Sequence, residues 1–86
     1  MEMAKYILQI LRTQPIVVLS WGFHNACAIK NGLRFEVKGY LHQGAVEVVY
    51  NEGADLFEVR LSDGRIETDI YADCLVNVID RMVETK

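Results

Sequence analysis

The chain has 86 residues, of which 51% are hydrophobic, so it suits one small domain with a modest core and is too apolar for intrinsic disorder. Its net charge of −3 argues against nonspecific binding to nucleic acid or to an anionic membrane, because both depend on clustered Lys and Arg. No signal peptide and no apolar run of membrane-spanning length is recognisable. Cys27 and Cys74 are too few for a disulfide framework and are expected as free thiols. We therefore expect a single compact domain over residues 1–86, located in the cytoplasm.

The first predicted element is an amphipathic helix over Glu2–Thr13. Placed at about 100° intervals, its apolar residues fall in one arc that spans about 200°, which is wider than contact with a single surface requires. Pro15 is expected to end this helix, because its ring disfavours helical geometry at Gln14.

The next segment, Ile16–Leu19, is a run of four apolar residues, three of them β-branched. A short run without alternation is typical of a strand that is buried on both faces. The following residues, Ser20–Asn31, are expected to be irregular, with a turn at the pair Asn31 and Gly32.

Between Leu33 and Tyr71, residue character alternates with a period of two, which predicts a meander of four antiparallel strands. Turns are expected at His42–Gly44, Asn51–Asp55 and Ser62–Gly64. In the third strand of the meander, Phe57 and Val59 should be buried while Glu58 and Arg60 are exposed. In the fourth strand, Ile66, Thr68 and Ile70 should share one face.

A closing helix is predicted from about Ala72 to Glu84, with Asp69 or Asp73 favouring its start. Its apolar arc is again about 200° wide. The expected fold class is therefore α+β, in two layers. A mainly antiparallel sheet of about five strands, four of them in the meander, would carry the N-terminal and C-terminal helices on one face.

Candidate chemistry is sparse. His24 and Cys27 lie three residues apart and could form a nucleophile with its base or half of a metal site, but His42 and Cys74 stand alone. Zinc sites usually show two closely spaced ligand pairs, so we expect no catalytic residue, no metal site and no cofactor. Both cysteines are expected to pack as small apolar side chains.

The segment that contains Trp21, Phe23 and His24 is the predicted binding site. Two large aromatic residues on either side of a glycine could line a pocket or anchor a partner. The alternative is that both rings extend the core.

Nucleic-acid binding would require the cations of the sheet to converge on one patch, namely Lys30, Arg34, Lys38, Arg60 and Arg65. Their strands also carry Glu36, Glu47 and Glu58, and mixed rows of this kind usually form a solvated sheet surface.

The function expected from these observations is a non-enzymatic protein-interaction or structural module that associates with itself as a dimer. Both helices and Ile16–Leu19 offer more apolar surface than one sheet face can cover, and monomers rarely expose large apolar patches. The alternative is a small-ligand-binding or enzymatic domain with a pocket near Trp21, Phe23 and His24.

Overall fold

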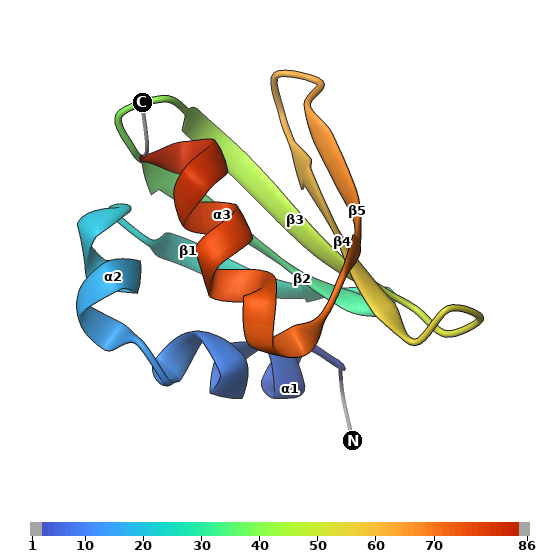
Figure 1. Cartoon of the computed structure of the whole chain (residues 1–86). Coiled ribbons are helices and arrows are strands. Elements are labelled where there is room, and N and C mark those ends of the chain that lie inside the picture. The colour runs from blue at the N-terminus through green and yellow to red at the C-terminus, as the bar shows by residue number, and fades with distance from the viewer. Residues whose placement is uncertain (1–2, 85–86) are drawn as a thin grey trace.

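The computed structural model describes residues 3–84, which form three α-helices, one short 3-10 helix and five strands (Figure 1). The strands make one open antiparallel sheet in chain order, with helices before and after it, so the predicted α+β class is confirmed. The elements along the chain are α1 (Met3–Arg12), α2 (Pro15–Ser20), β1 (His24–Ile29), β2 (Gly32–Lys38), β3 (Gln43–Asn51), β4 (Leu56–Leu61), β5 (Ile66–Ile70), η1 (Ala72–Cys74) and α3 (Leu75–Val83).

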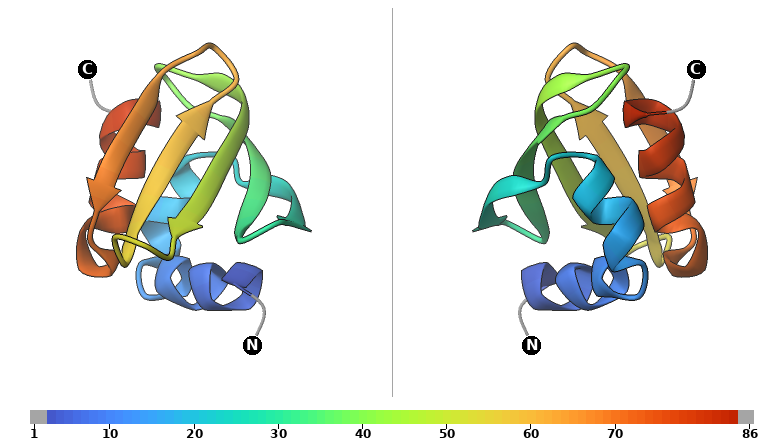
Figure 2. Two further views of the ribbon diagram at one scale, coloured as in Figure 1. Left: turned by 90° about the vertical axis from the view of Figure 1, so that its right-hand side faces the viewer. Right: turned by 90° about the vertical axis from the view of Figure 1, so that its left-hand side faces the viewer.

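The sheet is strongly curved, and the helices lie on its concave side and at one end of it (Figure 2). α1 contacts β1 and β2, and it also contacts α2 and α3. Part of the wide apolar arc of each terminal helix is thus used in contact between helices. Less apolar surface on the terminal helices therefore remains for a partner than the sequence predicts.

The core lies between the concave face of the sheet and the helices. In β4, Phe57 and Val59 are buried and Arg60 is exposed, as the alternating pattern predicts. Glu58 is half-buried rather than exposed, and its carboxylate accepts a hydrogen bond from the guanidinium of Arg60. The side chains that are buried most completely are those of Trp21, Phe35, Ile7, Leu11, Leu33, Leu75, Ile79, Val37, Val46, Val48, Val59 and Val83.

The prediction of a buried strand at Ile16–Leu19 is wrong, because these residues form most of α2. Pro15 does not continue α1 but occupies the first turn of this second helix, where its missing N–H removes no hydrogen bond. The side chains of Ile16 and Leu19 are 82% and 75% exposed. A run of only four apolar residues fits a strand or a helix equally well, and here the proline at the helix start favours the helix.

The fifth strand is instead β1, within the segment that was predicted to be irregular. β1 is an edge strand that pairs with β2 alone. Its register against β2 shifts between the pairs His24–Glu36 and Cys27–Arg34, which leaves one extra residue on β1. Asn25, within that interval, has a φ of 55°. The extra residue interrupts the alternation by which a strand is recognised in a sequence.

A second irregularity changes the face of Ile66 in β5. Val59 pairs with Glu67 while Phe57 pairs with Ile70, so β5 has one residue more than β4 between these positions, where Asp69 has a φ of 58°. Ile70 is buried as predicted, but Ile66 pairs with Arg60 on the convex face and is 56% exposed. The predicted common face for Ile66, Thr68 and Ile70 is wrong for this reason.

The closing helix consists of η1 followed by α3, and neither predicted aspartate caps it with a side-chain hydrogen bond. Asp69 belongs to β5, whereas Asp73 lies in the first turn of η1, where a carboxylate suits the helix dipole. At its other end, α3 meets the loop between β2 and β3. The N–H of Leu41 donates to the carbonyl of Val83 over 2.6 Å, and a Cβ on Gly39 would lie 2.6 Å from the same oxygen. Only glycine allows this close approach.

Candidate functional site

Trp21, the first of the three predicted binding residues, is part of the core and has no exposed surface. Its indole stacks against Phe35 of β2, with ring centroids 6.5 Å apart. Its Nε1–H donates to Oδ1 of Asp80 on α3 over 2.9 Å, and its carbonyl accepts from the N–H of Lys38 over 2.7 Å. Trp21 therefore joins α2, α3 and β2 rather than lining a pocket.

Phe23 and His24 point to different sides of the sheet. Phe23 is half-buried and its ring lies 4.7 Å from that of Phe35, on the side of the helices. His24 pairs with Glu36 in the sheet, and its Nε2 lies 3.8 Å from the Glu36 carboxylate. Its Nδ1 lies 2.6 Å from the carbonyl of Gly22, which limits how the ring can turn. The structure thus does not bring Trp21, Phe23 and His24 together at one site.

Phe23 instead belongs to an apolar groove between α1 and α2, with a volume of about 290 Å³. Ile16 and Leu19 of α2 are the two most exposed large apolar residues in the described chain, and Leu19 itself lines the groove. We refer to Ile16, Leu19 and the groove together as the α2 surface. The residues that line the groove are Leu8, Leu11, Arg12, Pro15, Val18, Leu19 and Phe23.

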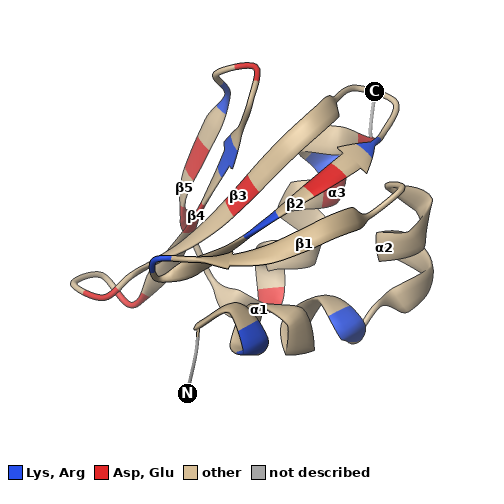
Figure 3. Ribbon diagram, turned by 180° about the vertical axis from the view of Figure 1, so that it is seen from behind, with Lys and Arg blue, Asp and Glu red and all other residues tan. Residues whose placement is uncertain are grey.

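The convex face of the sheet carries both signs of charge, interspersed along the strands (Figure 3). Arg34 lies 3.9 Å from the carboxylate of Glu47 across β2 and β3, and Arg60 pairs with Glu58. Arg34, Glu47 and Arg60 line one shallow depression of about 320 Å³. Each arginine therefore has an acidic neighbour, which weakens this face as a binding surface for phosphates.

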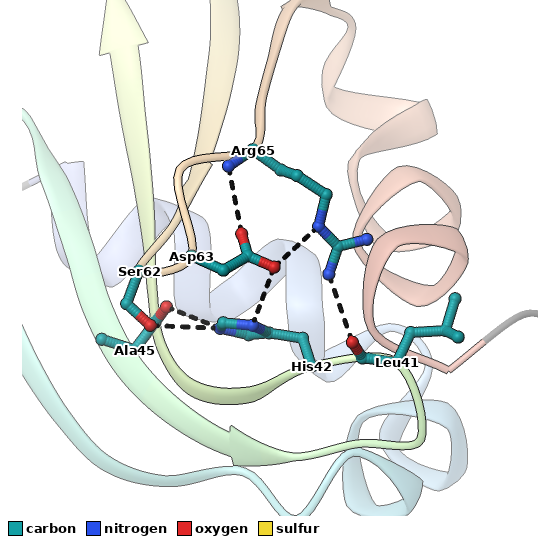
Figure 4. A network of polar contacts seen from close by, with 6 residues as sticks. All are labelled: Leu41, His42, Ala45, Ser62, Asp63 and Arg65. Carbon is teal, nitrogen blue, oxygen red and sulfur yellow. Dashed lines mark hydrogen bonds and ion pairs between the residues drawn. The ribbon is translucent and has the colours of Figure 1, made fainter.

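A buried histidine lies where the β2–β3 loop meets the β4–β5 hairpin (Figure 4). His42 is only 5% exposed. Its Nε2 lies 3.1 Å from the carbonyl of Ala45 and 3.4 Å from Oγ of Ser62, and its Nδ1 lies 3.6 Å from Oδ2 of Asp63. A Cβ on Gly44 would lie 2.7 Å from Oγ of Ser62, so the contact between Ser62 and His42 depends on a glycine at that position.

A hydrolytic triad uses the same residue types as Ser62, His42 and Asp63. Their hydrogen bonds and distances, however, do not fit those of a triad. A general base needs a lone pair on Nε2, whereas the Ala45 carbonyl facing Nε2 places the proton there. The distance of 3.6 Å between Nδ1 and Asp63 is also too long for the hydrogen bond that orients such a base. This cluster is therefore a structural contact between two loops.

Asp63 holds the hairpin turn. Its Oδ1 accepts the backbone N–H of Arg65 over 3.0 Å, and its Oδ2 accepts Nε of Arg65 over 2.9 Å. The pKa of Asp63 is lowered chiefly by the backbone hydrogen bond from Arg65. The side-chain bond from Arg65 and the charges of Arg65 and His42 lower it further, whereas desolvation opposes the shift. Because the folded-state pKa is depressed, the stabilisation is present at neutral pH and is lost as the pH falls through the lowered value.

Sequence reasoning missed the contact between His42 and the pair Ser62 and Asp63, since it treated them as separate turn residues. The topology offers a signal that could have found it. In a meander, alternate turns lie at the same end of the sheet, so the β2–β3 loop and the β4–β5 hairpin must be neighbours.

The expected packing role of the cysteines is wrong, because both Cys27 and Cys74 are exposed. We predict that the double variant with Cys27→Ser and Cys74→Ser changes the free energy of unfolding by less than about 0.5 kcal/mol. Urea denaturation followed by circular dichroism measures this difference, and native wild-type protein should react with a thiol reagent at both positions. A loss above about 2 kcal/mol would show that at least one thiol is buried.

Within residues 3–84, no three His, Cys, Asp or Glu side chains are grouped so that they could hold a metal ion. The helices of the same range are all too short or too polar to cross a membrane. No protein-family model matches the chain, and searches of curated proteins and of solved structures gave no significant match.

Proposed function

We propose that this chain is a non-enzymatic protein-interaction module that forms a homodimer through the α2 surface. The observation that carries the proposal is the exposure of Ile16 and Leu19, at 82% and 75%, beside an apolar groove. Two large apolar side chains on one short helix are costly to leave in water, at about 1.5 to 3 kcal/mol each. Covering them with a second surface removes that cost.

The shape of the α2 surface supports a second copy of the chain as the partner. A two-fold interface requires one patch that contains both projecting side chains and a recess that accepts them, because each protomer presents the same residues. Ile16 and Leu19 protrude from α2, and the groove beside them is lined by Leu8, Leu11 and Phe23. The side chains of one protomer can therefore enter the groove of its partner. Dimerisation would at the same time remove the exposed apolar surface of both chains.

A cytoplasmic location is part of this proposal. The thiols of Cys27 and Cys74 are both exposed and free, a state that is retained in a reducing compartment.

The alternative function, a ligand-binding or enzymatic pocket, receives support from only one of its three predicted residues. Phe23 lines the groove, whereas Trp21 is buried and His24 interacts with Glu36. A ligand in this groove would meet an almost entirely apolar lining, which offers little for chemistry.

We predict that light scattering at micromolar concentration gives about twice the chain mass for the wild type, and the mass of one chain for the double variant with Ile16→Glu and Leu19→Glu. Because both side chains are largely exposed, the variant should keep its fold, which circular dichroism checks. Ile66→Glu is the matched control, since Ile66 is 56% exposed on the convex face and its replacement should leave the dimer intact.

Three results would contradict the proposal. If the wild type stays monomeric throughout the micromolar range, the α2 surface is not a dimer interface. A double variant that remains dimeric places the interface elsewhere. If Ile66→Glu alone dissociates the dimer, the convex face of the sheet is the interface.

A further inference from the structure

A third hollow lies at the end of the sheet where the β3–β4 turn, α1 and the segment after β5 meet. Its volume is about 540 Å³, and its main lining residues are Tyr6, Tyr50, Asp55, Phe57, Tyr71 and Asp73. It is separate from the α2 surface, because it uses Tyr6 near the start of α1 whereas the groove uses Leu8 and Leu11. We call it the tyrosine hollow.

Four aromatic rings from four parts of the chain surround the tyrosine hollow. Phe57 is buried, with the ring of Tyr6 stacked 6.2 Å from it and the ring of Tyr50 tilted at 5.4 Å. Tyr6 and Tyr71 remain exposed, and Tyr71 directly follows β5. The faces of aromatic rings carry negative electrostatic potential and attract cations.

The two carboxylates of the hollow add negative charge to these rings. The Tyr50 hydroxyl donates a hydrogen bond to Oδ1 of Asp55, and this bond raises the pKa of Tyr50. The hydroxyl therefore stays protonated at neutral pH and orients the carboxylate. In the part of the chain that the structure describes, the ion pairs involve neither Asp55 nor Asp73. Both charges can thus act on a ligand.

We propose that the tyrosine hollow binds an organic cation, an ammonium or guanidinium group, between the tyrosine rings and the carboxylates of Asp55 and Asp73. An apolar ligand would use the rings but would not neutralise the charge of either carboxylate. An anion would be repelled by both aspartates and by the net charge of −3. The cation can come from a free amine or from a Lys or Arg side chain, because both present the same chemistry.

The test is a titration of isotope-labelled protein, followed by its amide and aromatic NMR signals. Choline is the cationic probe, and 3,3-dimethylbutan-1-ol is its neutral counterpart of the same shape. Choline is expected to give saturable shifts at Tyr6, Tyr50 and Tyr71 that weaken as salt is added, whereas the alcohol gives none that saturate. Short peptides with one Lys or one Arg, compared with free butylamine and butylguanidinium, distinguish a side chain from a small molecule as the source.

Variants locate the site. Tyr71→Ala should weaken choline binding about three- to fivefold, while Tyr40→Ala should have no effect. Tyr40 is a matched control because both tyrosines are 66% exposed and Tyr40 lies in the β2–β3 loop. The double variant with Asp55→Asn and Asp73→Asn should weaken binding about five- to tenfold. Glu47→Gln removes a negative charge from the convex face and should leave binding within about twofold.

Equal shifts with choline and with the alcohol would overturn the proposal, because the hollow would then recognise apolar shape alone. Equal losses in Tyr71→Ala and Tyr40→Ala would also overturn it, since binding would not be localised. Either result leaves the dimer proposal untouched, because none of these variants alters the α2 surface.

Discussion

Replacing Trp21 with alanine is expected to lower the free energy of unfolding by about 3 to 5 kcal/mol. The indole is completely buried, stacks on Phe35 and donates to Asp80, so its loss leaves a large cavity and removes a link between β2 and α3. Trp21→Phe keeps an aromatic ring but loses the N–H, and it should cost about 1.5 to 3 kcal/mol.

Urea denaturation followed by far-ultraviolet circular dichroism measures both values, since Trp21 is the only tryptophan and fluorescence is lost in the variants. If Trp21→Ala costs less than about 1 kcal/mol, the indole cannot occupy the core as described. If Trp21→Phe costs nothing, the bond to Asp80 does not stabilise the fold.

Replacing Phe57 with alanine is expected to be equally severe, at about 3 to 5 kcal/mol. Phe57 is buried between Tyr6 and Tyr50, and its strand partner Ile70 is buried as well. Since a domain of this size has only about 5 to 10 kcal/mol of stability, the variant should be partly unfolded at moderate temperature.

Tyr71→Ala is the matched control for Phe57→Ala, because Tyr71 lies beside the same hollow but is exposed. It should change the free energy of unfolding by less than about 0.5 kcal/mol. Similar losses in the two variants would mean that burial does not distinguish these positions.

The sequence predicts the meander well and the segment before it poorly, for a physical reason. From Leu33 to Leu61 the strands alternate regularly, because one face packs on the helices and the other meets water. β1 and the second half of β5 each contain an extra residue with a positive φ, and a period of two does not survive such an insertion. The run Ile16–Leu19 is too short for its pattern to distinguish a strand from a helix, and Pro15 in the first turn favours the helix.

A candidate site is hard to predict from the sequence when its residues are far apart along the chain. The sequence predicts excess apolar surface on both terminal helices and on Ile16–Leu19, and within the described residues the two most exposed large apolar side chains are Ile16 and Leu19. The tyrosine hollow combines Tyr6, Tyr50 and Tyr71, whose proximity follows from the closure of the fold. A site made of residues so far apart becomes recognisable only when the order and direction of the strands are known.

The extra residues in β1 and β5 affect whether other chains can add to the edges of the sheet. β1 and β5 are the two edges of an open sheet, where unpaired N–H and carbonyl groups can template a strand from another molecule. A bulge with a left-handed residue, Asn25 on one edge and Asp69 on the other, twists the edge and breaks the regular spacing of those groups. We therefore expect both edges to resist the stacking of chains into fibrils, so that self-association, if it follows the proposed α2 surface, would close after two copies.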